Sequence, residues 1–365
     1  MHKDAPPAAA LLGYGRFGRA FASLLLDAGI KVTAYDPRAE IPAALRAGDL
    51  GALAAAADVV FAAVPVAATE EALAALRPHL RARHLVLDVA SIKHGPVAAM
   101  TEVLGRDIPW AATHPLFGPM SVARGERPLQ AVVCPNPLHP QAHKRARALY
   151  ERAGCSVIEE TADQHDRVMA DTHALAFFVA KGMLEIGAHE DVAFAPPSFK
   201  AMTQTIDAVR SDAGHLFYAI ARGNPHAEAS RARLLDALTR IHRKIAETPD
   251  AGEQSRKELS IPSPAGPPPE LKEMRELIDE LDEQLISLLA RRAQLAHHTA
   301  RVKAGEGRAV RDPEREKSLL ARRAEWAREY DLLPQEVLGV FDAILSFSRA
   351  EQRRWLAQHK EEGTA

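Results

Sequence analysis

A glycine-rich turn near the N-terminus constrains the fold of this chain more than any other feature of its sequence. The apolar run Ala9–Leu12 leads directly into Gly13-Tyr14-Gly15-Arg16-Phe17-Gly18, and a helical pattern follows. In such a strand–turn–helix unit, the first glycine permits the tight turn, the second lets a pyrophosphate approach the backbone, and the third lets helix and strand pack closely. The helix N-terminus supplies amide donors and positive potential. The turn therefore predicts a dinucleotide-binding βαβ unit.

An acidic residue ends the next predicted strand. Lys31–Tyr35 is followed by Asp36, about twenty residues after the glycine turn, where a carboxylate can bind ribose hydroxyls and repel a 2′-phosphate. This favours NAD over NADP as the cofactor. Arg38 keeps the alternative open, because an arginine there could accommodate the extra phosphate. A glycine turn in an α/β domain that binds no nucleotide is the plainer interpretation, and the order strand–turn–helix–strand–Asp argues against it.

Short apolar runs alternate with helical stretches through the first part of the chain, which is the pattern of a parallel α/β sheet. The runs are Ala9–Leu12, Lys31–Tyr35, Val59–Val64, His84–Val89, Trp110–Thr113 and Gln130–Cys134. We therefore predict a doubly wound α/β (Rossmann) domain over residues 1–157. Beyond Asp163 the strand signals stop, and apolar residues at helical spacing predict an all-α substrate and dimerisation domain over residues 158–248.

A proline-rich segment separates this part from the C-terminal end. Residues 249–269 have the composition of a linker. Residues 270–360 are then almost entirely helical in pattern, with an apolar stripe along a long first helix. Asp312 and Pro313 fit the N-cap and first position of a second helix, and a third begins near Pro334. We predict a separate all-α domain here.

Composition excludes several classes of function. The 365-residue chain has a formal net charge of −2, so no global basic field points to nucleic acid or to an acidic membrane surface. No apolar stretch is long enough to cross a membrane, and nothing resembles a signal peptide. Cys134 and Cys155 are too few for a disulfide framework or a metal cluster, and we interpret them as reduced thiols. We therefore expect a cytoplasmic protein without a metal.

Two predicted loops carry candidate catalytic groups at the carboxyl ends of strands, where ligands of doubly wound sheets bind. The loop after His84–Val89 contains Ser91 and Lys93, which we expect to project toward the cofactor cleft. The loop after Trp110–Thr113 contains His114, whose imidazole titrates near neutrality and suits proton abstraction. By itself, His114 is better interpreted as one of the chain's 16 histidines on a surface loop.

Together these segments resemble the prephenate and arogenate dehydrogenase family. A GxGxxG start, a D-x-x-S-x-K loop and an H-P-x-F-G-P loop occur in the family's order, and the resemblance covers residues 8–248. It implies oxidative decarboxylation of a cyclohexadiene acid with NAD, and a helical second domain that forms a dimer. His114 would take the proton from the substrate's ring hydroxyl, and Ser91 would hold that hydroxyl and His114 in register. Relatives often carry an acidic residue after F-G-P, and Met120 in that place favours prephenate over the amine-bearing arogenate.

The resemblance also implies a cation for the substrate carboxylates in the second domain. The best match is Lys200, which departs from the family's arginine and gives a point charge in place of a bidentate fork. Arg210 is the alternative. His165 and His173 lie in a segment that resembles the one facing the substrate, but we expect His165 to cap or orient a helix and to touch no substrate.

The C-terminal helices carry polar groups at regular spacings. Arg275 lies in the first turns of the long helix, and Arg292 and Lys303 follow about three turns apart on nearly the same face. Ser348 and Gln352 lie one turn apart on the third helix. A solvated charged face and a coiled-coil dimerisation tail are the plainer interpretations, although the stripe does not keep a strict heptad register.

This layout closely resembles the all-helical chorismate mutase family, over residues 270–358. The residues at that family's motif positions are Arg275, Arg292, Lys303, Asp312, Arg315, Glu316, Ser348 and Gln352. The resemblance implies that the arginines clamp the carboxylates of chorismate, that Lys303 and Gln352 donate to its ether oxygen, and that the other residues hold hydroxyl or carboxylate groups. It also implies a dimer in which Arg275 serves the partner's site.

The two resemblances fit one another, because a chorismate mutase makes prephenate and a prephenate dehydrogenase consumes it. We therefore expect a bifunctional homodimer that converts chorismate to 4-hydroxyphenylpyruvate, on the way to tyrosine. Two alternatives stay open. One is an arogenate or dual-specificity dehydrogenase, and the other is a dehydrogenase whose helical tail serves only dimerisation or regulation.

Overall fold

The computed structural model describes residues 7–188, 195–211, 214–248, 271–305 and 311–360. Contacts within the chain divide it into two compact units, the first made of Met1–Gly118 and Leu129–Gly266 and the second of Pro119–Pro128 and Pro267–Ala365. None of the helices in the described ranges is both long enough and apolar enough to cross a membrane.

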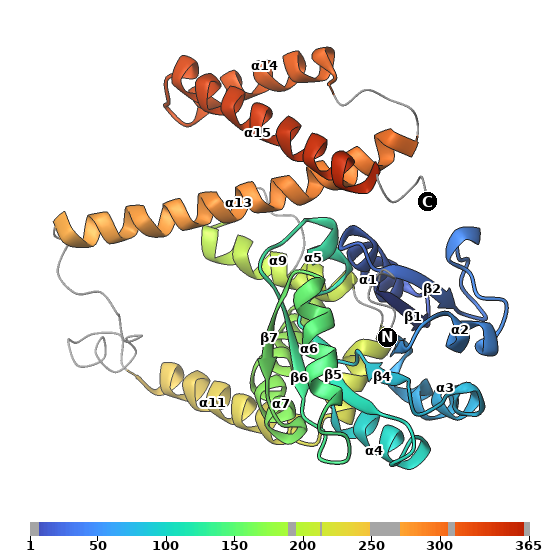
Figure 1. The fold of residues 1–365 in the computed structure, drawn as a ribbon. Helices are drawn as coiled ribbons and strands as arrows, with labels where there is room; N and C mark the ends of the chain where they lie inside the picture. Colours follow the sequence, from blue (N-terminus) through green and yellow to red (C-terminus); the bar gives the residue numbers. More distant parts are fainter. Residues whose placement is uncertain (1–6, 189–194, 212–213, 249–270, 306–310, 361–365) are drawn as a thin grey trace. The chain divides into compact units, whose positions relative to one another are not determined.

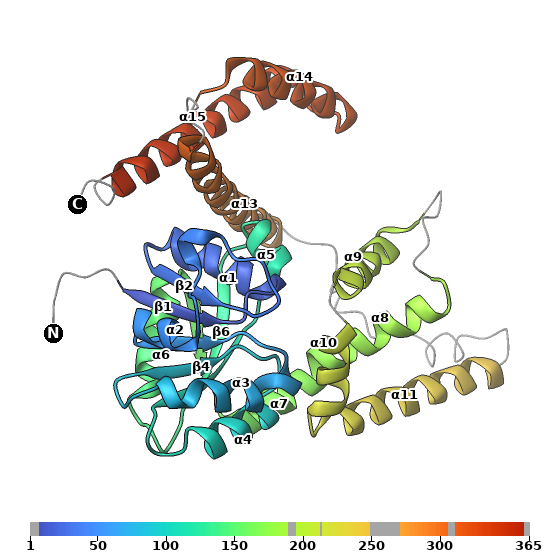
Figure 2. The ribbon, with the colours of Figure 1, turned by 90° about the vertical axis from the view of Figure 1, so that its right-hand side faces the viewer.

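The first unit is built on a seven-stranded sheet with the order β2-β1-β3-β4-β5-β6-β7 (Figures 1 and 2). The strands are β1 (Ala8–Leu12), β2 (Lys31–Tyr35), β3 (Val59–Ala62), β4 (Leu85–Asp88), β5 (Trp110–Pro115), β6 (Leu129–Cys134) and β7 (Cys155–Glu159). Neighbours are parallel except for β5 and β6. Because β1 lies between β2 and β3, the strand order reverses there, which places the ligand crevice of a doubly wound sheet. The predicted Rossmann-type fold is confirmed.

The sheet differs from the prediction at its far end. β5 continues through His114 and Pro115, which pair with residues of the antiparallel strand β6, so His114 lies inside a strand and not in the loop after it. β7 was not predicted. It is an edge strand in which only Cys155 is buried, so its sequence lacks the apolar pattern that marks a central strand.

Helices connect the strands and then replace them. Those between strands of the first unit are α1 (Arg16–Asp27), α2 (Leu50–Ala56), α3 (Thr69–Leu76), α4 (His94–Val103) and α6 (Ala142–Arg152). After β7 come α7 (Ala162–Met169), α8 (Leu175–Glu185), α9 (Pro197–Ser211), α10 (Gly214–Tyr218) and α11 (Ala227–Glu247). Two π-helical turns, Ala170–Ala174 and Ala219–Gly223, interrupt the helices of this part of the chain. Such turns frequently occur at functional sites.

The second unit is helical, as predicted. It contains α5 (Pro119–Ala123), α13 (Leu271–Gly305), α14 (Pro313–Glu329) and α15 (Pro334–Lys360). Both α13 and α14 pack on α15, and small buried side chains such as Ala293, Ala296 and Ala327 allow close approach. Asp312 caps α14 by accepting a hydrogen bond from the Arg315 N–H at 3.0 Å, which confirms the predicted helix start.

Candidate functional site

The glycine turn between β1 and α1 leaves room for an anion beside the backbone. Gly13 has a φ of +105°, and a Cβ atom there would lie 2.3 Å from the carbonyl oxygen of Ala63. A Cβ at Gly18 would lie 2.5 Å from the carbonyl oxygen of Gly13, so glycine is needed for α1 to begin this close to β1. A Cβ at Gly15 would meet nothing within 4 Å, so the first amides of α1 stay accessible. These residues fit a dinucleotide pyrophosphate.

Asp36 holds this turn in place. Its carboxylate accepts hydrogen bonds from the backbone N–H groups of Tyr14 at 2.7 Å, Arg38 at 2.8 Å and Ala39 at 3.0 Å. Burial raises the pKa of Asp36, but these donors and the Arg38 charge outweigh burial and lower the pKa overall. An ionised carboxylate therefore stands at the carboxyl end of β2, the position at which ribose hydroxyls bind in such folds.

The other predicted cofactor residues line the same turn. Tyr14 is buried, and the guanidinium of Arg19 lies 5.7 Å from the centre of its ring. Arg16 is exposed at the first position of α1. Phe17 packs on Phe21 with a centroid distance of 5.5 Å, so its ring belongs to the core beneath the turn.

A buried ion pair joins the carboxyl ends of β4 and β5. The Lys93 ammonium contacts the Asp88 carboxylate and donates to the carbonyl oxygen of Thr113, while the Thr113 N–H donates to Asp88 Oδ1 at 2.8 Å. Lys93 is fully buried, so the expectation that it projects toward the cofactor cleft is wrong. Asp88 draws the ammonium inward, because a buried charge needs a partner. Ser91, in the same loop, is half-buried.

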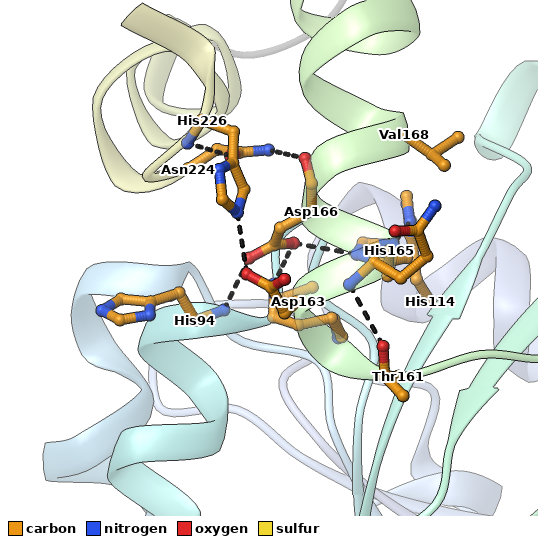
Figure 3. A network of polar contacts seen from close by, with 12 residues as sticks. His94, His114, Thr161, Asp163, His165, Asp166, Val168, Asn224 and His226 are labelled. Atoms are coloured by element: carbon orange, nitrogen blue, oxygen red, sulfur yellow. Dashed lines mark hydrogen bonds and ion pairs between the residues drawn. The ribbon is translucent and has the colours of Figure 1, made fainter. Parts of the chain in front are cut away.

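His114 lies at the carboxyl end of β5 in a cluster of histidines (Figure 3). Its Nδ1 is 2.9 Å from Nε2 of His165 on α7, and its ring is stacked with that of His173 at a centroid distance of 6.3 Å. Burial, His165, Lys93 and His173 together hold the pKa of His114 well below its usual 6.5. His114 is therefore a neutral base at neutral pH, as proton abstraction requires. Within the described ranges, no group of His, Cys, Asp or Glu side chains is placed to hold a metal ion.

His165 has a different role from the helix cap that the sequence suggested. Thr161 caps α7 by accepting a hydrogen bond from the Gln164 N–H at 3.2 Å. His165 is buried, and its Nδ1 lies 2.8 Å from Oδ1 of Asp166. The His-Asp dipeptide in the first turns of a helix was the available signal. The sequence could not show that β7, which precedes α7, would bring this helix against His114.

The predicted carboxylate-binding cations lie on α9. Lys200 is exposed, and its ammonium is not among the charged groups that lower the pKa of His114. The side chain of Arg210 lies outside the described residues. The assignment of a cation to the substrate carboxylates therefore stays a prediction.

In the second unit, Arg292 on α13 meets Ser348 on α15. Arg292 Nε donates to Ser348 Oγ at 3.0 Å, and this hydroxyl donates to the carbonyl oxygen of Ile344 at 2.9 Å. Burial lowers the pKa of Arg292. One turn along α15, Oε1 of Gln352 is buried, and no group in the described part of the chain hydrogen-bonds it. A buried polar atom without a partner in the protein is a natural contact for a ligand.

Positive charge accumulates beside this pair. Burial and the charges of Arg292, Arg315 and Arg322 lower the pKa of Arg323 on α14. The guanidinium of Arg323 also lies 4.6 Å from the ring centre of Trp326. Neighbouring like charges of this kind favour the binding of an anion. The sequence interpretation missed Arg323, although its spacing of about two turns after Arg315 could have placed it on the same helix face.

The structure shows less about the remaining predicted residues of this unit. Glu316 accepts a hydrogen bond from Arg349 at 2.8 Å and lies 3.5 Å from Arg311, so its carboxylate is held by arginines that the sequence interpretation did not pair with it. Lys303 is half-buried in the last turn of α13. Arg275 also lies on α13, but its side chain is outside the described residues.

Comparison with known proteins identifies both parts of the chain. Residues 31–158 match the prephenate dehydrogenase nucleotide-binding domain, and residues 274–353 match chorismate mutase type II. Over 254 residues, the chain is 30% identical to 4-amino-4-deoxyprephenate dehydrogenase of Streptomyces pristinaespiralis, which covers 64% of this chain and 82% of that protein. Over 88 residues, it is 31% identical to chorismate mutase of Methanocaldococcus jannaschii, which covers 24% of this chain and 89% of that protein.

A solved structure shares the fold of the dehydrogenase part. Prephenate dehydrogenase from Aquifex aeolicus, crystallised with hydroxyphenyl propionate and NAD+, has a TM-score of 0.56 at 18% identity, over 77% of this chain and 99% of that chain. Another dehydrogenase relative is matched over only 39% of its own length. The chain belongs to the prephenate dehydrogenase family and carries, at its C-terminal end, a domain of the type II chorismate mutase family.

Proposed function

We propose that the chain rearranges chorismate to prephenate in its C-terminal domain, residues 270–360, and oxidises prephenate with NAD in its N-terminal domains, residues 1–157 and 158–248. The observation that carries the dehydrogenase proposal is a buried His114 with a lowered pKa at the carboxyl end of a strand of the nucleotide-binding sheet. The mutase proposal is supported by the charges of Arg292, Arg315 and Arg322 that act on Arg323, and by the buried amide oxygen of Gln352, which has no hydrogen-bond partner in the described part of the chain.

In the dehydrogenase reaction, His114 takes the proton from the ring hydroxyl of prephenate, and Ser91 holds that hydroxyl in register with the imidazole. NAD, when bound, accepts the hydride from the ring carbon that carries this hydroxyl. Loss of CO2 then makes the ring aromatic, and the proton returns to the phenol oxygen, so the products are 4-hydroxyphenylpyruvate, CO2 and NADH. Aromatisation supplies driving force, so the protein mainly has to position the reacting groups.

In the mutase reaction, the dianion chorismate rearranges in one pericyclic step without covalent catalysis. Arg292 and Arg315 clamp carboxylates, and Arg275 of a second copy completes the clamp. Lys303 and the amide Nε2 of Gln352 donate to the ether oxygen as negative charge develops on it. Asp312, Glu316 and Ser348 hold the remaining hydroxyl or carboxylate groups.

Two further roles are proposed in the dehydrogenase part. Asp36 selects NAD, because its carboxylate would repel the 2′-phosphate of NADP. Lys200 binds a substrate carboxylate, because a dianionic substrate needs a cation and α9 carries this ammonium exposed. A clear preference for NADP would contradict the first role, and an unchanged KM for prephenate in Lys200→Ala would contradict the second.

A homodimer is proposed from unpartnered apolar faces. Ile278, Leu281, Leu285 and Leu288 follow one face of α13, and each is at least half exposed. A second exposed series lies along α11 and consists of Leu235, Leu238, Ile241 and Ile245. Contiguous exposed apolar surface of this kind marks an interaction site. The proposed role of Arg275 at the partner's mutase site requires that the apolar face of α13 forms part of the dimer interface.

The cysteines support a reducing compartment. Cys134 and Cys155 are buried, and neither is in a disulfide bond; burial raises the pKa of Cys134 to about 12. We therefore propose the cytoplasm as the location, since thiols persist there.

Product analysis with chorismate and NAD tests the whole proposal. The full chain is expected to form 4-hydroxyphenylpyruvate, CO2 and NADH from chorismate and NAD, with no prephenate added. His114→Ala should lower dehydrogenase kcat about 100- to 10,000-fold, the contribution of a general base, and leave mutase activity intact. Arg292→Ala should do the reverse. Equal loss of both activities in either variant would argue against two separate sites, and His242→Ala, an exposed position on α11, is the control.

The same assay separates the alternatives. A chain that oxidises prephenate but does not consume chorismate would have a tail that serves assembly or regulation only. Relatives are named for arogenate/prephenate and for 4-amino-4-deoxyprephenate. We propose prephenate because Met120 offers no carboxylate to a substrate amine. A higher kcat/KM with either amine-bearing compound would overturn that choice and leave the dehydrogenase assignment standing.

A further inference from the structure

The carboxylate of Asp166 is held by hydrogen-bond donors on both oxygens (Figure 3). Oδ1 accepts from the backbone N–H of Lys93 at 2.8 Å and lies 2.8 Å from Nδ1 of His165, while Oδ2 accepts from the backbone N–H of His94 at 2.9 Å. Asp166 and His165 are both buried. Because both oxygens accept backbone N–H groups, the carboxylate serves as a hydrogen-bond acceptor at this place. His165 therefore donates to it from Nδ1.

This hydrogen bond fixes the proton positions along the pair of rings. A neutral imidazole carries one N–H and one lone pair, so a neutral His165 that donates from Nδ1 has its lone pair on Nε2. That Nε2 lies 2.9 Å from Nδ1 of His114, which must then be the donor. His114 consequently keeps its own lone pair on Nε2.

We propose that Asp166 and His165 form a positioning relay that selects the tautomer of His114 in which Nε2 is free to take the substrate proton. The inference rests on the proposed dehydrogenase function, because that reaction uses the lone pair. When His114 takes the proton, its Nδ1–H still donates to His165, and the nearby Asp166 carboxylate stabilises the positive charge. No proton has to travel along the relay.

The surrounding contacts keep the relay in one geometry. Asn224 Nδ2 donates to the carbonyl oxygen of Asp166 at 2.7 Å, so the segment before α11 holds α7 from one side. The start of α4 holds α7 from the other side, because the backbone N–H groups of Lys93, its N-cap, and His94, its first residue, donate to the Asp166 carboxylate. The charged and titratable groups that face His114 are His165, Lys93 and His173, and the Lys93 charge is itself paired with a carboxylate.

Substitutions at His165 and Asp166 test the relay through dehydrogenase kcat. His165→Phe removes the acceptor for His114. Asp166→Asn replaces one of the two acceptor oxygens with an N–H donor, so it weakens the hydrogen bonds that fix the tautomer of His165. We expect each to lower kcat for prephenate about 100- to 10,000-fold, the range for loss of a general base. NAD binding should persist and reports that the nucleotide-binding fold is intact. The dehydrogenase pH profile should change along with kcat, which a merely structural role would not cause.

Two variants sharpen this test. His165→Gln can accept from His114 with its amide oxygen and donate to Asp166 with its amide nitrogen, so it should retain at least about a tenth of wild-type kcat, far above the loss expected for a missing base. Asp163→Asn makes the same chemical change on the same helix but outside the relay, since Asp163 pairs with His226 and Arg167. It should keep full activity.

A measurement without substrate separates the relay from the reaction. In the full chain labelled with nitrogen-15 histidine, NMR should show that wild-type His114 carries its proton on Nδ1. In Asp166→Asn, a larger fraction of His114 should carry the proton on Nε2. A wild-type His114 protonated on Nε2, or full kcat in His165→Phe, would overturn the relay. If the wild-type protein oxidises no prephenate, the proposed function fails. The NMR measurement of the His114 tautomer still shows whether the relay exists.

Discussion

At the scale of single residues, burial and near neighbours decide which of many polar side chains can act. The chain has 16 histidines, and a histidine in water is partly protonated at slightly acid pH. His114 differs because burial and the groups around it lower its pKa. Burial also lowers the pKa of Arg292, and burial together with neighbouring arginines lowers the pKa of Arg323.

The pH dependence of the dehydrogenase should reflect the lowered pKa of His114. The base must be unprotonated, and kcat/KM reports ionisation of the free enzyme. A pKa below 6.5 therefore moves the acid limb of kcat/KM for prephenate below pH 6.5. The check is a steady-state series across acid and neutral pH with prephenate as the varied substrate. An acid limb centred above that value would contradict the burial of a neutral base.

Stability should also depend on these histidines. The pKa values of His114 and His173 are both lowered in the folded chain. Below the unfolded value of about 6.5, the unfolded chain binds protons that the folded chain refuses, so stability falls as pH falls through this window. The slope is at most about 1.4 kcal/mol per pH unit for each histidine. Urea unfolding of the wild type and of His173→Gln should show a smaller pH effect in the variant, while His242→Gln should change nothing.

At the scale of elements, the glycine turn shows one motif whose members have different physical roles. Gly13 meets the backbone of Ala63 and has a positive φ, while Gly15 faces open space. The sequence correctly predicted the tight turn at Gly13 and the close packing at Gly18, because both depend on a local strand–turn–helix path. It did not predict the π-helical turn Ala170–Ala174, because that interruption depends on packing against other segments of the fold.

Alanine at the two glycines should separate folding from cofactor binding. Gly13→Ala places a Cβ 2.3 Å from a carbonyl oxygen at a φ of +105°, and we expect it to cost about 2 kcal/mol or more. Gly15→Ala should change stability by no more than about 1 kcal/mol yet weaken NAD binding at least about tenfold, equal to about 1.4 kcal/mol. Thermal unfolding and NAD titration measure the two effects. Normal NAD affinity in Gly15→Ala would exclude the turn as the pyrophosphate site.

At the scale of the whole molecule, the proposed dimer would make mutase activity depend on the exposed apolar face of α13. A double variant, Leu281→Glu with Leu285→Glu, should break the dimer at that face, because burial of two charges opposes association. Mutase activity should then fall at least about tenfold, since Arg275 of the partner is lost from the site. Sedimentation velocity and chorismate consumption are the measurements, with Glu280→Gln on the same helix as the control. A monomer with full mutase activity would contradict the shared site.

The sequence by itself determined the features whose signal is local along the chain. These include the glycine turn, the strand that ends at Asp36, the N-cap at Asp312 and the order of the two sets of motifs. Helical period, turn chemistry and capping preferences all act over a few residues, so a pattern of residue types is enough to report them.

Only the tertiary structure decided which polar groups meet. His114 and His165 are 51 positions apart, and their 2.9 Å contact exists because β5 and α7 are brought together by the sheet. The inward turn of Lys93 toward Asp88 has the same origin, since the carbonyl oxygen of Thr113 on the next strand completes its site. A buried polar side chain takes the partner that the fold places beside it, and a linear pattern does not contain that distance.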